Sequence, residues 1–282
     1  MTLKTRHMDC SETHPGCRAL REAARRSGVA DADNLPFMYQ PQQATLAALL
    51  VHGFTATPWE MRPLAEFLAE AGIASLAVRL PGHGTSPEDL ARRSWQEWQA
   101  SVTEGYRLLA ADYPTVFGMG MSTGCLLLLI TALEQDYYGL VLFSPYLRIR
   151  HKLASYAGWL RWIRPYQVKA NGDELLSRYY HRRPVAGIHQ INRLLKVLRP
   201  RLSAITCPVI AFNGEGDETV QVASGRELID QLGSAVRIHE MYGPDVPHVL
   251  TREENPCRWS MFDQAARFVQ EIDHPGAPKR VT

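Results

Sequence analysis

Cysteine is scarce in this chain of 282 residues. The five cysteines are Cys10, Cys17, Cys125, Cys207 and Cys257. Their number is odd and they are spread over the whole chain, whereas a disulfide framework is typical of short secreted chains with an even number of cysteines. We therefore expect free thiols and a reducing compartment.

Long apolar runs are also missing. No stretch of 18 or more apolar residues occurs, which excludes a helix that spans a membrane. The N-terminal residues 1–17 include basic side chains but neither an apolar stretch nor a small-residue cleavage signal, as a secretory signal peptide would have. We expect a cytoplasmic protein.

A cluster of potential metal ligands lies near the N-terminus, at His7, Cys10, His14 and Cys17. The sequence Pro15-Gly16 interrupts any helix that would align these side chains. The loop that usually separates two pairs of zinc ligands is absent as well. We therefore expect no metal site here.

The remaining composition favours one catalytic body of the α/β class. Apolar residues make up 45% of the chain, enough for a large core. From Pro36 onward, short apolar runs alternate with amphipathic helical stretches, which predicts a mainly parallel sheet with helices on both faces. The expected strands include Leu46–Val51, Ile73–Arg79, Leu140–Phe143, Pro208–Asn213 and Val236–Met241, and the expected helices Trp59–Ala71, Asp89–Leu109, Cys125–Leu133 and Ser260–Ile272.

Three regions differ in character along the chain. Residues 1–35 are polar and irregular, and we expect a loosely ordered leader there. Residues 36–145 and 204–275 carry the α/β pattern, and residues 146–203 form an insertion between two expected strands. Residues 145–204 contain thirteen Lys or Arg against two acidic residues, a net charge of +11 (13 − 2), although the whole chain carries only +2.

The pentapeptide Gly120-Met121-Ser122-Thr123-Gly124 has the form G-x-S-x-G. It lies between an expected strand and a nearly all-apolar helix, where two glycines permit the sharp turn that exposes a serine hydroxyl. The amides and dipole at the start of that helix favour the negative charge that develops on an attacked carbonyl. We infer that Ser122 is a nucleophile.

A serine nucleophile needs a base, and the base needs an acid that holds it in one tautomer. The loop after the expected strand at 208–213 offers Asp217, with Glu215 and Glu218 as competitors. His248 follows the last expected strand on a loop rich in turn residues. We therefore expect Asp217 as the acid and His248 as the base.

The oxyanion of such a reaction requires two backbone N–H donors, one after the nucleophile and one from the loop after an earlier strand. Thr123 and Phe54 occupy these positions. We also expect the Phe54 ring and Met121 to contact the substrate. His52 and His83 are expected to be structural histidines, since the reaction needs one base.

At this point the sequence resembles the bacterial carboxylesterases and monoacylglycerol lipases of the α/β-hydrolase superfamily, from about Leu49 to Phe268. The resemblance rests on LLVHGFTATPWEMRPLAEFLAEAG, RLPGHGTSPEDL, GMSTG, NGEGDETV and PHVL. It implies an α/β-hydrolase fold with a helical cap at 146–203, and hydrolysis of short or medium acyl esters without a metal or organic cofactor. Cys125 stands where the family usually has a glycine, which suggests sensitivity to thiol reagents.

Two other functions stay open. The alternatives to an esterase are a thioesterase or acyltransferase for acyl-coenzyme A or an acyl carrier, and a non-catalytic binding protein on a hydrolase scaffold. The basic, aromatic cap suits contact with anionic lipid or with the phosphates of an acyl carrier, while a solvated charged surface is the simplest explanation. No nucleic-acid-binding module accompanies the charge, and we expect no nucleic-acid partner.

Overall fold

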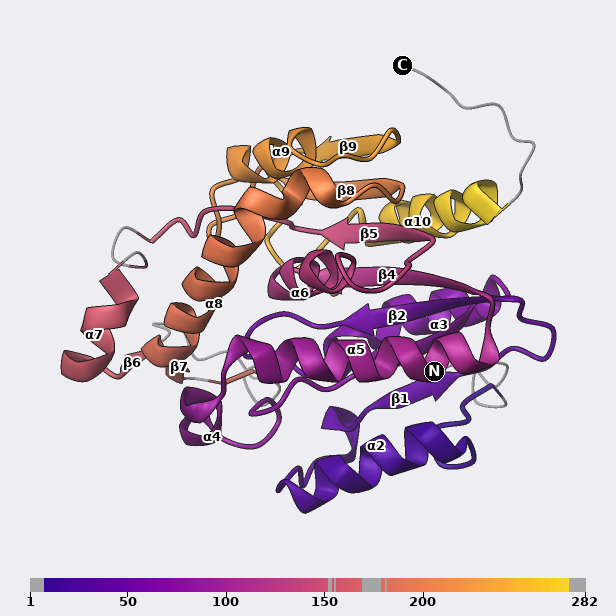
Figure 1. The fold of residues 1–282 in the computed structure, drawn as a ribbon, viewed down its shortest axis with the longest axis horizontal. Coiled ribbons are helices and arrows are strands. Elements are labelled where there is room, and N and C mark those ends of the chain that lie inside the picture. Colours follow the sequence, from indigo (N-terminus) through magenta and orange to yellow (C-terminus); the bar gives the residue numbers. More distant parts are fainter. Residues whose placement is uncertain (1–7, 152–153, 155, 169–178, 181, 274–282) are drawn as a thin grey trace.

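The structure is a computed structural model, which describes residues 8–151, 154, 156–168, 179–180 and 182–273. Its centre is a seven-stranded sheet with the order β1-β3-β2-β4-β5-β8-β9 (Figure 1). The strands are β1 (Phe37–Tyr39), β2 (Leu46–Val51), β3 (Ala74–Val78), β4 (Thr115–Met121), β5 (Gly139–Phe143), β8 (Val209–Gly214) and β9 (Arg237–Tyr242). Only β1 runs antiparallel to its neighbour in this sheet, so the predicted α/β fold with a mainly parallel sheet is confirmed.

Helices cover both faces of this sheet, as expected for strands that are buried on both sides. One face packs mainly against α5, α6 and α8, and the other against α3 and α10. The helices outside the 146–203 insertion are α2 (Pro15–Arg26), α3 (Arg62–Glu70), α4 (Pro87–Arg92), α5 (Trp95–Asp112), α6 (Thr123–Thr131), α9 (Ala223–Asp230) and α10 (Arg258–Asp273), with short 3-10 helices η1 (Ala32–Asn34) and η2 (Pro58–Met61). In the described ranges no helix is both long and apolar enough to cross a membrane.

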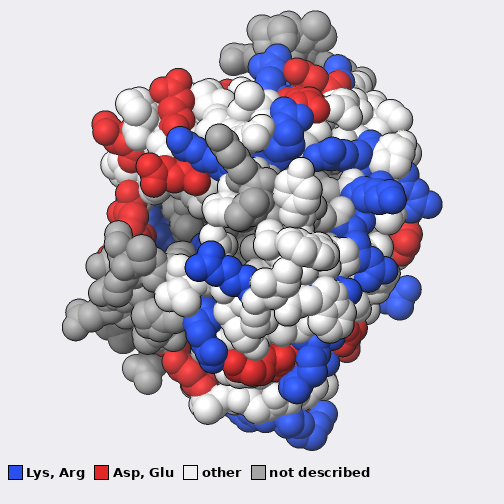
Figure 2. All heavy atoms as spheres, turned by 90° about the vertical axis from the view of Figure 1, so that its left-hand side faces the viewer, with Lys and Arg blue, Asp and Glu red and all other residues white. Residues whose placement is uncertain are grey.

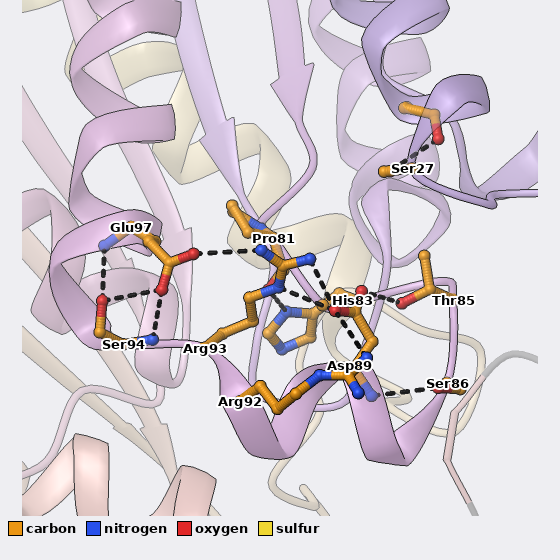
Figure 3. A network of polar contacts seen from close by, with 12 residues as sticks. Ser27, Pro81, His83, Thr85, Ser86, Asp89, Arg92, Arg93, Ser94 and Glu97 are labelled. Carbon is orange, nitrogen blue, oxygen red and sulfur yellow. Dashed lines mark hydrogen bonds and ion pairs between the residues drawn. The ribbon is translucent and has the colours of Figure 1, made fainter.

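The single helix expected at 89–109 is two helices, because Ser94 begins a new one. The Ser94 hydroxyl accepts the Glu97 amide, and the Glu97 carboxylate accepts the Ser94 amide, so the two residues form a capping box. Arg93 joins the helices, since its guanidinium binds Asp89 of α4 and Glu97 of α5 (Figure 3). A local capping signal here outweighs the continuous apolar periodicity.

The segment expected to be a loose leader is ordered from Met8 onward; residues 1–7 lie outside the described residues. Helix α2 buries Cys17 against the core. Arg21 donates to the Pro36 carbonyl at 2.7 Å and also binds Glu12. The Cys10 amide donates to the carbonyl of Met38 in β1. The order comes from these few tertiary contacts, which a polar local sequence does not reveal.

The insertion between β5 and β8 lies on one side of the molecule, where Figure 1 places α7 and α8. Its described elements are α7 (Ala157–Ile163), β6 (Tyr166–Val168), β7 (Arg182–Pro184), α8 (Val185–Leu198) and the 3-10 helix η5 (Arg199–Ala204). Residues 152–153, 155, 169–178 and 181 of the expected insertion lie outside the described residues. Tyr180 ties the insertion to the core, because its hydroxyl donates to the Gly82 carbonyl and accepts the Thr85 amide.

Two fully buried histidines, His52 and His83, lie side by side, and their ring centroids are 5.0 Å apart. The Nε2 atom of His52 accepts the Leu80 amide, which requires a neutral ring. Burial lowers the pKa of His52 from 6.5 to about 4, and burial together with the nearby His52 lowers the pKa of His83 as well. Both rings are therefore neutral at pH 7.

We expect these histidines to make the fold sensitive to acid. In the unfolded chain they bind protons near pH 6.5, whereas the folded chain resists protonation, so stability is complete above pH 6.5 and is lost as the pH falls toward 4. The lowered pKa of His52 alone corresponds to about 3 kcal/mol. Urea unfolding between pH 7 and pH 4.5 measures the loss, and His83→Gln should lose less over this range. An equal loss of stability in the variant would show that His83 does not contribute to the acid sensitivity.

Candidate active site

Ser122 sits on a sharp turn between β4 and α6, with φ 54° and ψ −113°. This left-handed backbone is strained for a residue other than glycine. The turn closes because a Cβ atom is absent on both sides: one on Gly124 would lie 2.2 Å from the Val51 carbonyl oxygen, and one on Gly120 2.7 Å from the Cys125 nitrogen. The G-x-S-x-G spacing thus reflects contacts with the neighbouring strand and helix.

The structure brings Ser122, His248 and Asp217 into one hydrogen-bonded relay. The Nε2 atom of His248 lies 2.9 Å from the Ser122 hydroxyl oxygen. The Nδ1 atom of the same ring lies 2.5 Å from Oδ2 of Asp217. These three residues come from loops at the carboxyl ends of β4, β8 and β9, although 126 positions separate Ser122 from His248.

The Asp217 carboxylate is buried and fixed at both oxygens. Its Oδ1 atom accepts the amides of Thr219 and Val220 at 2.8 and 3.0 Å, which leaves Oδ2 for His248. The competing acids Glu215 and Glu218 are exposed at their positions on the same loop. Geometry therefore distinguishes Asp217 from its two neighbours.

His248 is held from its backbone as well as from its ring. The Ser144 hydroxyl donates to the His248 carbonyl at 2.7 Å, and Ser144 itself has a left-handed φ of 53° directly after β5. The backbone of His248 is therefore bound to the residue after β5, and its ring is bound to the carboxylate in the loop after β8. This arrangement positions a general base in one tautomer, with the proton on Nδ1.

The amides of Phe54 and Thr123, the two expected oxyanion donors, lie in the loop after β2 and at the start of α6. The carbonyl of Gly53 accepts from His52 Nδ1 at 2.9 Å and from the Ala56 amide at 3.2 Å. Because N–H and C=O point in opposite directions across a trans peptide, the Phe54 amide is turned away from these donors. Thr123 is the first residue of α6, where amides have no partner within the helix. Among the described residues no hydrogen bond uses either amide.

A cavity of about 1160 Å³ opens above this relay. Phe54 and Met121, the two residues expected to contact the substrate, both line it. Phe54 packs so closely against α8 that a Cβ on Gly187 would lie 2.4 Å from its ring. The insertion supplies apolar walls to the cavity, at Ile149, Ala154, Ala157, Leu160, Val185, Ile188 and Ile191. The cavity is thus polar at its floor, and the insertion lines it with both apolar and charged side chains.

Glu60 in η2 is a buried acid at the cavity that was not among the expected site residues, and it is only 2% exposed. Its Oε2 atom accepts the Gly53 amide at 2.7 Å and its Oε1 atom accepts the Tyr179 hydroxyl at 2.9 Å. Burial raises the pKa of this carboxyl. Glu60 therefore joins the loop that carries Phe54 to the insertion. A lone acid in an amphipathic stretch gives no sequence signal for such a position.

The expected thiol sensitivity of Cys125 does not fit its surroundings. The side chain is fully buried, and Sγ donates to the carbonyls of Gly120 and Phe143 at 3.0 and 3.2 Å. Burial raises its pKa far above neutral, so the reactive thiolate is not formed. Cys125 packs the start of α6 as a small apolar residue.

Within the described residues, no three His, Cys, Asp or Glu side chains are grouped so that they could hold a metal ion. His7 of the N-terminal cluster lies outside these residues. His14 instead accepts the Cys17 amide at the start of α2 and contacts Asp112 at 2.8 Å. Burial raises the pKa of Cys10 to about 11 and that of Cys17 to about 12, so both thiols stay protonated.

Comparisons with known proteins show which family the sequence matches. A family profile described as "Alpha/beta hydrolase family" matches residues 48–271. The chain is 32% identical over 221 residues to a thermostable monoacylglycerol lipase of Bacillus sp. (strain H-257), covering 76% of this chain and 86% of the relative. It is 22% identical over 232 residues to a carboxylesterase of Bacillus subtilis (strain 168), covering 80% and 93%.

Solved structures share the fold at lower sequence identity. One is a structure from a study of the metagenome-derived lipolytic enzymes LipS and LipT, with a TM-score of 0.76, 22% identity, and coverage of 86% of this chain and 99% of that chain. Another is the Paleococcus ferrophilus monoacylglycerol lipase, with a TM-score of 0.68, 17% identity, and coverage of 84% and 98%.

Replacing Asp217 tests the relay. In Asp217→Asn the negative charge of the carboxylate is lost, so the side chain cannot stabilise the charged imidazole ring or fix its tautomer. We therefore expect kcat to fall by about three to four orders of magnitude with little change in KM. Glu215→Gln and Glu218→Gln are matched controls on the same loop and should keep nearly full activity. The kinetics of ester hydrolysis measure all three variants. A severe loss of activity in either control would identify that residue, and not Asp217, as the acid.

Proposed function

The chain belongs to the alpha/beta hydrolase family and hydrolyses carboxylic esters, and we propose that it does so through an acyl-enzyme on Ser122. The observation that carries the proposal is the relay from Ser122 through His248 to Asp217, at 2.9 and 2.5 Å, at a cavity whose lining includes apolar side chains of the insertion. A binding protein on the same scaffold would not need such a relay.

Acylation begins when His248 Nε2 removes the proton of the Ser122 hydroxyl while Oγ forms a bond to the ester carbonyl carbon. The carbonyl oxygen becomes negative, and the amides of Phe54 and Thr123 stabilise it. The imidazolium then protonates the alcohol oxygen as the bond from carbon to that oxygen breaks. Asp217 remains a carboxylate throughout and stabilises the charged ring.

Deacylation uses the same groups with water in place of the alcohol. His248 removes a proton from the water, and the oxygen attacks the acyl carbon through a second oxyanion at Phe54 and Thr123. The ring then returns the proton to Ser122 as the carboxylic acid leaves. Phe54 packs against Trp98 and α8, which keeps this part of the loop rigid during both steps.

We propose lipophilic esters of the monoacylglycerol type, or other short or medium acyl esters, as substrates. The cavity volume of about 1160 Å³ exceeds that of ordinary small-molecule sites. Its apolar walls come from residues 146–203, which we propose act as a cap over the acyl chain. The names of the two Bacillus relatives, a monoacylglycerol lipase and a carboxylesterase, support the same class.

The Ser122→Ala variant tests this function. Loss of the nucleophile should reduce kcat by about 10⁶-fold, because the remaining groups cannot replace a covalent step. Hydrolysis of 4-nitrophenyl esters from acetate to palmitate, with monoacylglycerol and acyl-coenzyme A in parallel, measures both the dependence on Ser122 and the preferred chain. Near-normal ester turnover in the variant, or turnover of the thioester alone in wild type, would contradict the proposal.

We further propose that the cap rests on anionic lipid. Helix α7 presents Trp159 and Trp162, which are 67% and 77% exposed, and the Arg161 guanidinium lies 4.9 Å from the Trp162 ring. Exposed aromatics with basic neighbours are typical of surfaces that lie in a lipid interface. The proposed location is the cytoplasm, whose reducing conditions suit the five free cysteines and whose membrane leaflet is anionic.

Vesicle sedimentation tests the lipid contact. We expect the protein to bind vesicles that contain phosphatidylglycerol more strongly than vesicles of phosphatidylcholine alone, and to lose this binding in the double variant Trp159→Ala, Trp162→Ala. Trp259→Ala is the matched control, because Trp259 is 50% exposed on α10, outside the insertion. Equal binding by all three proteins would exclude α7 as the contact.

A further inference from the structure

Arg183 in β7 is a charged side chain for which the described part of the chain offers no partner. It lines the cavity, is half-buried, and its Nε atom is buried without any hydrogen-bond partner. Among the described residues, no ion pair or hydrogen bond to its guanidinium is found. A guanidinium that lines a cavity without an ion pair keeps its N–H donors available to an anionic ligand.

The other arginines near Arg183 differ from it. Its chain neighbour Arg182 is exposed and pairs with Glu88 at 2.7 Å. On the cavity wall, Arg150 donates to the Asp217 carbonyl at 3.2 Å. Arg252 lies 3.4 Å from the Trp59 ring centroid, close enough to Glu60 to oppose the rise of that carboxyl's pKa. Arg183 thus brings positive charge to the cavity without a direct ion pair to any described acid, including Glu60, Glu218 and Glu254 of the cavity lining.

The position of Arg183 relates it to the reaction centre. Its charge acts on the buried hydroxyl of Tyr146, and that hydroxyl lies 3.1 Å from Oγ1 of Thr123, the residue after the nucleophile. Burial lowers the pKa of Arg183, yet a guanidinium stays protonated at neutral pH. Figure 2 shows the corresponding face of the molecule, where Lys and Arg side chains stand around a hollow.

We propose that the cavity takes esters that carry an anionic group, a carboxylate or a phosphate, near the scissile bond, and that Arg183 binds this group. The proposal rests on the ester hydrolysis proposed above and narrows its substrate class. A guanidinium suits the task because its planar fork of N–H donors matches two oxygens of a carboxylate or a phosphate. The apolar walls under the insertion still receive the acyl chain.

Two pairs of substrates distinguish a carboxylate on the acyl side of the ester from a phosphate on its alcohol side. Mono-4-nitrophenyl adipate against 4-nitrophenyl hexanoate places a carboxylate on the acyl side. A 1-acylglycerol 3-phosphate against the 1-monoacylglycerol with the same chain places a phosphate on the alcohol side. In each pair the quantity of interest is kcat/KM for the anionic ester divided by kcat/KM for the neutral ester.

In Arg183→Met we expect this ratio to fall about tenfold or more for at least one pair, because a hydrogen-bonded charge is lost while neutral esters keep their contacts. Arg183→Lys, which keeps the charge but not the fork, should lie in between. Arg182→Met is the matched control next to it and should leave both ratios unchanged.

Unchanged ratios for both pairs in Arg183→Met would overturn the proposal while ester hydrolysis itself stands. If this variant does not fold, wild type alone decides: its ratio for one pair should fall with added sodium chloride, and ratios insensitive to salt overturn the proposal. Absence of turnover on every ester in wild type would instead overturn the proposed function.

Discussion

The site depends on how closely the Ser122 turn packs against the neighbouring strand. Val51 at the end of β2 pairs with Gly120 at the end of β4, so the two strands finish side by side. The lack of a side chain on Gly124 lets α6 start directly against the Val51 carbonyl. This contact sets Ser122 beside the loop that carries the Phe54 amide, and one backbone approach thereby positions both halves of the proposed oxyanion site.

Parallel strands bring the rest of the chemistry to the same edge of the sheet. The loops after β5, β8 and β9 contribute Ser144, Asp217 and His248. Backbone atoms bind the Ser144 hydroxyl and the Asp217 carboxylate, and that carboxylate in turn binds the His248 ring. Catalytic groups from distant parts of the chain therefore need no flexible side chain to meet. The insertion then adds apolar walls and the cationic Arg183 above a floor that the sheet already defines.

The sequence predicted those features whose signal is local. Ser122, Asp217 and His248 each follow an apolar strand pattern, and the order of their loops limits the choice of acid and base. Glu60 and Arg183 could not be predicted, because their roles come from burial against segments far away in the chain. A basic helical stretch at 18–26 was visible in the sequence, but its packing against the core was not expected for the same reason: its few buried contacts are tertiary, while its surface is polar.

The central claim is that Ser122 is activated by this relay and forms the acyl-enzyme. The most direct measurement is labelling with a fluorophosphonate, followed by mass spectrometry of the intact protein and of its peptides. The account predicts one adduct per chain, on Ser122, with loss of esterase activity in proportion to labelling and much slower labelling of Asp217→Asn. Labelling on another residue, or full activity after the reaction, would contradict it.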